Sequence, residues 1–200
     1  MADKKFSISF YGGAREVTGS CYLLETDSHK LLIDCGMFQG HREADEKNHA
    51  DFPFSPASIE SVILTHAHLD HIGRVPKLVK DGFRGKIFST ASTRDLAEIM
   101  WKDAAHIESE EEVPLYGDSD IAMTMSLFQT LSYYEPVYIE KDLSFQMLSA
   151  GHILGSSMVR FQLGNRVFTV SGDVGNEPSV LMPPRSSASD TNILLVESTY

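Results

Sequence analysis

The sequence has only two cysteines and no long hydrophobic run. Cys21 and Cys35 have neither CxxC nor metal-finger spacing, so we expect two buried thiols rather than a disulfide framework or a zinc finger. The longest apolar runs, such as residues 193–196, are far too short to cross a bilayer, and residues 1–5 do not lead into an apolar signal core. We therefore expect a cytoplasmic protein that does not engage a membrane.

Basic side chains are also scarce. The chain has 17 lysines and arginines against 28 aspartates and glutamates, which gives a formal net charge of −11. Because a nucleic-acid-binding domain is usually basic, this balance argues against a stand-alone RNA-binding module. Bound metal cations would offset part of the acidity where they sit.

The 200 residues are enough for one good-sized core or two small ones, and short apolar and alternating segments divide them mostly into strands. Strands are predicted at 5–11, 20–25, 30–34, 61–65, 86–89, 136–139, 143–149, 157–163, 166–171 and 193–196, the last of them buried. Helices are predicted over 72–79, after an N-cap at Ser92 with an apolar stripe from Leu96 to Ile107, and near 118–131, while 35–58 is expected to be irregular. This pattern predicts an α/β four-layer sandwich in one domain, residues 1–200.

Four candidate metal ligands lie within residues 65–71, where a short buried strand is predicted to end. In an extended backbone, residues two apart point the same way, so His66 and His68 can hold one ion together. The turn that follows lets Asp70 and His71 face a neighbouring position. Imidazole and carboxylate suit zinc, manganese or iron, and this density of histidine indicates a metal site rather than a polar loop.

Two further candidates lie at strand ends in the same way. His152 follows the strand predicted at 143–149, and Asp173 follows the strand predicted at 166–171. Each comes directly after a glycine, which lets backbone approach an ion without a side-chain clash. Alone, each would be read as a surface or turn residue, but an ion held by two histidines still needs ligands.

Four motifs resemble those of the β-CASP branch of the metallo-β-lactamase superfamily. They are GGAREVTGS at 12–20, LTHAHLDH at 64–71, AGHILGS at 150–156 and ESTY at 197–200. They follow the family's order over nearly the whole chain, and they are most similar to the bacterial and archaeal relatives of the endonuclease that cleaves messenger-RNA 3′ ends. The resemblance implies the N-terminal part of an αββα metallo-β-lactamase sandwich, with the β-CASP cap domain beginning near the C-terminus.

The resemblance also implies two zinc ions, with manganese or iron as alternatives, and a hydroxide between them as the nucleophile. The ligands would be His66, His68 and His152 for the first ion, Asp70 and His71 for the second, and Asp173 bridging both.

Three carboxylates take further roles by the same resemblance. Asp70 and Asp173 would be catalytic residues as well as ligands. Glu197 would support a histidine that protonates the leaving oxygen. Asp34, at the end of a predicted strand, would orient the ligand histidines from behind.

The chain departs from the family pattern after His152, because no histidine follows it. In the family, the last ligand of the second ion and the proton-donating histidine come from beyond the cap domain. The sequence stops at Tyr200, inside the motif that leads into that cap. We therefore expect an N-terminal portion of a longer protein, with weak activity on its own.

Three functions compete. The motifs favour an endoribonuclease of RNA processing or decay that acts on single-stranded RNA, with a homodimer as its expected assembly. A small-molecule hydrolase of the same fold would cleave a thioester, lactone or β-lactam, but it has no need of the motif at 197–200. A non-catalytic RNA-processing subunit would tend to lose ligands, and here all six are present.

Overall fold

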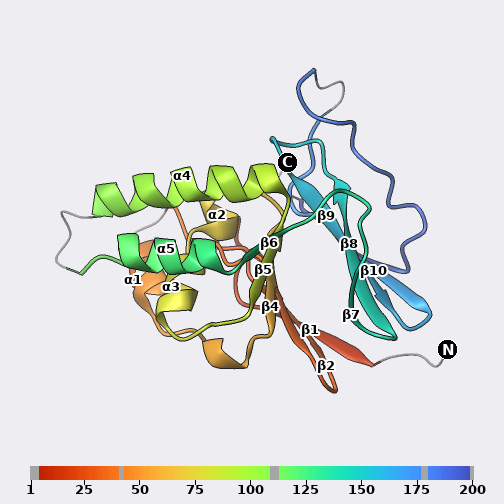
Figure 1. The fold of residues 1–200 in the computed structure, drawn as a ribbon, viewed down its shortest axis with the longest axis horizontal. Helices are drawn as coiled ribbons and strands as arrows, with labels where there is room; N and C mark the ends of the chain where they lie inside the picture. The colour runs from red at the N-terminus through yellow and green to blue at the C-terminus, as the bar shows by residue number, and fades with distance from the viewer. Residues whose placement is uncertain (1–4, 41–42, 109–112, 177–179, 199–200) are drawn as a thin grey trace.

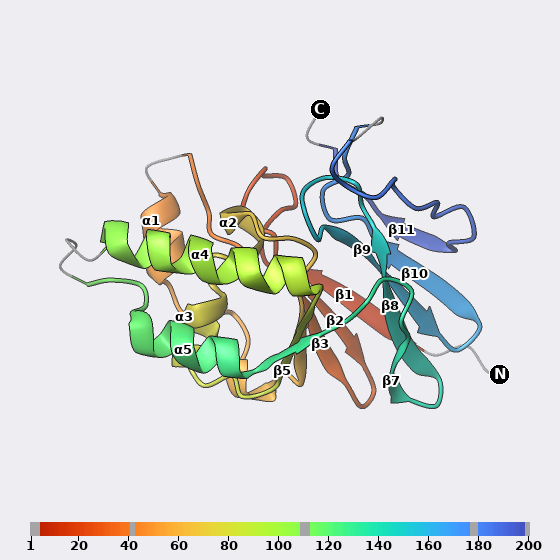
Figure 2. The same ribbon diagram turned by 45° about the horizontal axis from the view of Figure 1, so that its top comes forward.

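Two β-sheets lie face to face, and helices cover the outer face of one of them (Figure 1). The computed structural model describes residues 5–40, 43–108, 113–176 and 180–198. The α/β class is confirmed, and three of the four predicted layers are present: helices, sheet and sheet. Within the described ranges, no helix covers the outer face of the second sheet (Figures 1 and 2).

The first sheet has six strands and combines an antiparallel meander with parallel strands. In spatial order they are β1 (Phe6–Phe10), β2 (Tyr22–Thr26), β3 (Lys30–Ile33), β4 (Ser61–Ile63), β5 (Lys86–Ser89) and β6 (Phe128–Thr130). β1 to β3 pair antiparallel, and β3 to β6 pair parallel. The carboxyl ends of β3 and β4 therefore share one edge of the sheet, where Asp34 and the segment 64–71 follow.

The second sheet has five strands and delivers the later candidate ligands. In spatial order they are β11 (Ile193–Leu195), β10 (Arg166–Val170), β9 (Ser157–Leu163), β8 (Leu143–Ser149) and β7 (Val137–Glu140). β8 and β10 both pair antiparallel with β9, so they run in the same direction. Their carboxyl ends meet at one edge, which places the loops bearing His152 and Asp173 side by side.

The helical layer packs on the first sheet over one apolar core (Figure 2). Its elements are α1 (Ala44–His49), a 3-10 turn at Pro56–Ser58, α2 (Leu69–Ile72), α3 (Val75–Lys80), α4 (Ala91–Glu108) and α5 (Asp118–Ser126). A second core fills the space between the sheets. There the rings of Phe88, Phe145, Phe161 and Phe168 form a continuous series with centroid separations of 5.3–5.9 Å, which favours edge and offset contacts.

Two predicted helices and one segment predicted to be irregular need correction. The helix predicted over 72–79 is divided, because Pro76 has no N–H for the carbonyl of Ile72, and Trp101 Nε1 donates to that carbonyl instead at 3.0 Å. The helix predicted near 118–131 ends at Ser126, and β6 follows. The segment predicted to be irregular contains α1, which is anchored by Asn48 hydrogen bonds to the backbone of Phe38 rather than by an apolar stripe.

The start and the buried face of α4 also differ from the prediction. The N-cap is Thr90, whose Oγ1 accepts the Thr93 N–H at 3.2 Å, so Ser92 lies inside the helix. Ile99 and Ile107 are 63% and 69% exposed. The buried stripe of α4 is made of Thr93, Ala97, Trp101 and Ala104, of which Ala104 was predicted, while Leu96 and Met100 of the predicted stripe are partly buried against it.

The last predicted strand exists as β11, but it is an edge strand rather than a buried one. Ile193 and Leu194 are 41% and 49% exposed, and β11 pairs only with β10, in parallel, among the described strands. Cys21 and Cys35 are both free and buried, as predicted. No helix in the described ranges is long and apolar enough to span a membrane.

Candidate metal centre

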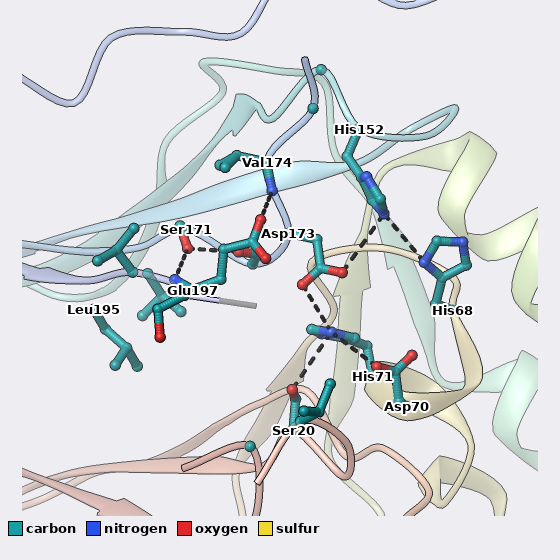
Figure 3. A pocket seen from close by; sticks show the side chains of 18 of the residues that line it. Ser20, His68, Asp70, His71, His152, Ser171, Asp173, Val174, Leu195 and Glu197 are labelled. Carbon is teal, nitrogen blue, oxygen red and sulfur yellow. Dashed lines mark hydrogen bonds and ion pairs between the residues drawn. The ribbon is translucent and has the colours of Figure 1, made fainter. Parts of the chain in front are cut away.

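The candidate ligands come from strand ends of both sheets and converge at one edge of the sandwich (Figure 3). His66 and His68 lie between β4 and α2, and Asp70 and His71 lie in α2, while His152 follows β8 and Asp173 follows β10. The structure therefore brings together all six ligands predicted from the sequence.

Three histidines and one carboxylate form the first ligand group. One ligand atom from each of His66, His68, His152 and Asp173 lies within 4.8 Å of all the others. His68 Nδ1 is 3.1 Å from His66 Nε2 and 3.2 Å from His152 Nε2, and Asp173 Oδ2 is 3.7 Å from both Nε2 atoms. Nitrogens bound to one tetrahedral zinc lie about 3.4 Å apart, so the donors and their spacing fit a divalent cation.

The other oxygen of Asp173 faces a second ligand group. Oδ1 lies 3.2 Å from His71 Nε2, and that nitrogen lies 3.8 Å from Asp70 Oδ2. Asp173 thus presents one carboxylate oxygen to each group. Two carboxylates and an imidazole are donors of the kind that a divalent cation takes, but among the described residues only the first group has all its ligand atoms within 4.8 Å of one another.

A buried carboxylate behind the ligands orients two of the histidines. Asp34 is fully buried, and its Oδ2 accepts hydrogen bonds from His71 Nδ1 at 2.8 Å and Thr65 Oγ1 at 2.7 Å. Its Oδ1 accepts the Thr65 N–H at 2.8 Å. His66 Nδ1 donates to Thr65 Oγ1 at 3.1 Å. With Nδ1 protonated in both rings, each Nε2 lone pair is directed toward the ligand groups.

Burial and charge set the protonation of these histidines. Burial, together with the neighbouring imidazoles, lowers the pKa of His66 well below its usual value, which favours the neutral form that binds metal. Burial also lowers the pKa of His152. Burial alone would lower the pKa of His71 too, but the carboxylates of Asp34 and Asp173 raise it to about 10. A proton and a cation therefore compete for His71 Nε2.

Backbone conformation at Gly172 allows Asp173 to reach the site. Gly172 has a φ of 54°, a left-handed value that glycine adopts without strain. A Cβ there would lie 2.8 Å from Thr65 Cβ, so the loop after β10 can touch the segment after β4 only with glycine at this position.

Two site residues were not predicted from the sequence. Thr65 links Asp34 to His66, and the only signal for it was its place directly before the first ligand. Ser20 is buried, with Oγ 3.5 Å from both His71 Nε2 and the hydroxyl of Tyr22. Ser20 lies within the predicted motif at 12–20, but nothing in the spacing indicated its contact with His71.

Glu197 lies beside the Asp173 loop. Its Oε1 accepts the Val174 N–H at 2.6 Å, and its own N–H donates to Ser171 Oγ at 3.1 Å (Figure 3). The sequence predicted that Glu197 supports a histidine, and that role remains a prediction. Thr199 and Tyr200 of the same motif lie outside the described residues.

Five of the six candidate ligands, all except His66, line an open cleft of about 1320 Å³. Its wall includes the loop of the first motif, the loop after β10 and the segment after β11. Among its described lining residues, Arg15 is the one lysine or arginine, against Glu16, Asp70, Asp173 and Glu197. The described lining therefore carries more carboxylates than lysines and arginines.

Comparison with known proteins finds relatives of this chain in sequence. The sequence profile of the metallo-beta-lactamase superfamily matches residues 14–87, which include the first four ligands. A ribonuclease of Thermus thermophilus is 41% identical over 190 residues, which are 95% of this chain and 43% of that protein. The transcription termination factor FttA of Methanocaldococcus jannaschii is 35% identical over 96% of this chain and 31% of its own length. The chain thus spans less than half the length of these curated relatives.

A similar fold occurs among solved structures. A metallo-beta-lactamase of Cronobacter sakazakii, a mutant of its HARLDQ motif, has a TM-score of 0.63 and is 14% identical, covering 94% of this chain and 74% of that one. At this identity the likeness concerns the fold alone. It places both sheets and the helical layer in a shared architecture.

Proposed function

Since the chain belongs to the metallo-β-lactamase superfamily, in its β-CASP branch, we propose that it is a metal-dependent hydrolase that cleaves phosphodiester bonds in RNA. The observation that carries the proposal is the position of Asp173, whose two carboxylate oxygens face two separate ligand groups. In this proposal His66, His68 and His152 hold one cation, Asp70 and His71 hold another, and Asp173 bridges them.

The side chains of the site orient the histidine ligands, keep His66 neutral and supply negative charge. Divalent cations bound here would lower the pKa of a water molecule and offset negative charge on the phosphate. Asp34 keeps a proton on His71 Nδ1 and so directs its Nε2 toward Asp173. Burial keeps His66 neutral, and Asp70 and Asp173 supply the negative charge that two cations require.

The shape of the cleft favours a polymer over a small molecule. Pockets for small ligands usually enclose about 300–1,000 Å³, whereas this cleft is larger and open to solvent. The ribonuclease of Thermus thermophilus, with 41% identity, supports RNA as the polymer. The small-molecule alternative has no comparable support, and the full set of six ligands argues against a non-catalytic subunit.

Finer features belong to the same proposal. Zinc is the expected metal because three imidazoles dominate the first group, with manganese and iron as alternatives. The expected substrate is single-stranded RNA, and the expected compartment is the cytoplasm. The expected homodimer is checked by sedimentation. Residues 1–200 would form the N-terminal portion of the metallo-β-lactamase domain, followed by the cap in a longer protein.

The test is hydrolysis by chelator-treated protein with single metals restored. Hydrolysis of an activated phosphodiester by this chain, and of a labelled single-stranded RNA by a chain extended to the length of its relatives, should appear with zinc or manganese and disappear in His68→Asn, which removes one ligand of the first group. His49→Asn, on α1 and away from the ligands, should keep native activity. Full activity in the chelated protein or in His68→Asn would contradict the proposal.

A further inference from the structure

Glu197 makes a short hydrogen bond to the residue after Asp173. Its Oε1 accepts the Val174 N–H at 2.6 Å, a distance typical of a strong bond to a charged acceptor (Figure 3). Asp173 is therefore one peptide bond away from a backbone group, the Val174 N–H, that Glu197 holds in place. The contact joins the end of β11 to the loop after β10, two segments about twenty residues apart in the chain.

Glu197 is itself held in place by the strand pair that carries this loop. Ser171 donates its backbone N–H to the carbonyl of Leu195 at 2.9 Å, which extends the parallel pairing of β10 and β11. Glu197 returns its own N–H to Ser171 Oγ at 3.1 Å. The loop is thus tied on both sides of Asp173, at Ser171 and at Val174.

These hydrogen bonds restrain the backbone beside Asp173, whose two carboxylate oxygens must each lie at a defined place. Oδ2 must lie near His66 and His152 while Oδ1 lies near His71. Gly172, next to it, has a left-handed backbone with a φ of 54°. A functional group needs to be held within about 0.5 Å of its working position, and here a neighbouring backbone bond can do this.

We propose that Glu197 is a positioning residue for Asp173: its carboxylate holds the Val174 peptide so that both oxygens of Asp173 face their ligand groups. The inference rests on the proposed function only in taking Asp173 as a cation ligand. It differs from the role implied by the family resemblance, in which Glu197 acts through a histidine. Positioning affects the affinity for cations, whereas support of a proton donor affects only turnover.

Two conservative variants distinguish the effect of side-chain length, which sets whether Glu197 can reach the Val174 N–H, from the effect of its negative charge. Glu197→Gln keeps an oxygen at the same distance along the side chain but has no charge. Glu197→Asp keeps the charge but is one methylene too short to reach Val174 N–H. The matched control is Glu98→Gln, an exposed acid on α4 that is paired with Lys102. Melting curves in chelator check that every variant is folded.

The measurement is the affinity for zinc alone, by competition with a chromophoric chelator. Loss of a group that orients a ligand typically weakens metal binding about 10–100-fold. We expect Glu197→Asp to show a loss of this size, Glu197→Gln to stay within about threefold of the native chain, and Glu98→Gln to match it. Native affinity in Glu197→Asp, or equal losses in the Gln and Asp variants, would overturn the positioning role. A native chain that binds no zinc would overturn the proposed function along with it.

Discussion

The carboxylate of Asp173 contributes to both ligand groups, so its removal should affect both. Asp173→Asn keeps the shape of the side chain but removes the charge that shields two neighbouring cations. We expect zinc affinity to fall by about 100-fold or more, beyond the loss typical of residues that merely orient a ligand. The measurement is zinc content after dialysis. Asp190→Asn, which changes an exposed aspartate paired with Arg160, should retain native zinc content. Equal content in the two variants would show that Asp173 is not the bridge.

Asp34 stabilises the fold as well as the site, because three buried donors depend on it. Asp34→Ala would leave the Thr65 N–H, the Thr65 hydroxyl and His71 Nδ1 without their acceptor. We expect the free energy of unfolding to fall by about 3–5 kcal/mol, the range for breaking a buried charged network. Urea unfolding in chelator measures this without a contribution from metal. Asp27→Ala, in the exposed β2–β3 turn, is the control and should change stability little. A loss below about 1 kcal/mol for Asp34→Ala would contradict the argument.

At this scale the ligands could be predicted from the sequence, but their partners could not. Ligand type shows in composition and spacing, because histidines two residues apart at a strand end have few other uses. The contact of Glu197 with Val174 depends on the pairing of β10 with β11, which no local pattern shows. Thr65 was not predicted for the same reason: its role depends on a hydrogen bond to Asp34, which is about thirty residues away in the chain.

Among the elements, α4 connects the helical layer to the loop that bears His152. Thr90 Oγ1 accepts the Thr93 N–H and donates to the carbonyl of Gly155 at 2.8 Å. Thr90→Ala removes both bonds, and we expect it to lower the free energy of unfolding by about 1–2 kcal/mol. Ser92→Ala should change it by less than about 0.5 kcal/mol, because Ser92 lies inside the helix rather than at its cap. Thermal or urea unfolding measures both. A larger loss of stability in Ser92→Ala than in Thr90→Ala would show that Ser92 is the N-cap.

The strands were predicted more accurately than the helices, for a physical reason. Strand signals are local: alternation and short apolar runs between turn residues located every strand in the described part of the chain except β6. The boundaries of helices depended on tertiary contacts. Pro76 divides α2 from α3 because it has no N–H, and Trp101 donates to the carbonyl left free. Asn48 anchors α1 through polar hydrogen bonds, which an apolar pattern does not predict. The exposure of β11 follows from its place at the edge of the sheet, which depends on strand order.

For the whole molecule, cation binding and folding should be coupled. A ligand that binds only the native state raises the free energy of unfolding by about 2.7 kcal/mol at one hundred times its dissociation constant. We expect zinc to raise the melting temperature of the chelated chain and excess chelator to reverse the effect. Metal analysis at saturation should find more than one ion per chain. A melting temperature that responds to neither zinc nor chelator would contradict a native metal site.

The charge of the molecule predicts weak RNA binding by residues 1–200. The net charge is −11, and Arg15 is the one lysine or arginine among the described residues that line the cleft. Affinity for nucleic acid depends largely on lysine and arginine contacts to phosphate. We expect this chain to bind and cleave single-stranded RNA poorly, and a chain extended to the length of its relatives to do both well. Turnover by both chains on RNA and on an activated diester is the measurement. Equal RNA turnover would contradict the expectation.

The position of the ligands at the seam between the sheets has a mechanical consequence. His66 follows the first sheet and Asp173 the second, so a cation held by both would cross-link the two halves of the sandwich. Such a link closes a loop of about one hundred residues, and a covalent bond closing a loop of that size restricts the unfolded chain by about 4–5 kcal/mol. Unlike a disulfide, this metal cross-link can be removed by a chelator and restored by adding a metal salt. The two cysteines of the protein are free and form no such link. The same ions that would polarise a substrate would then also hold the two sheets together.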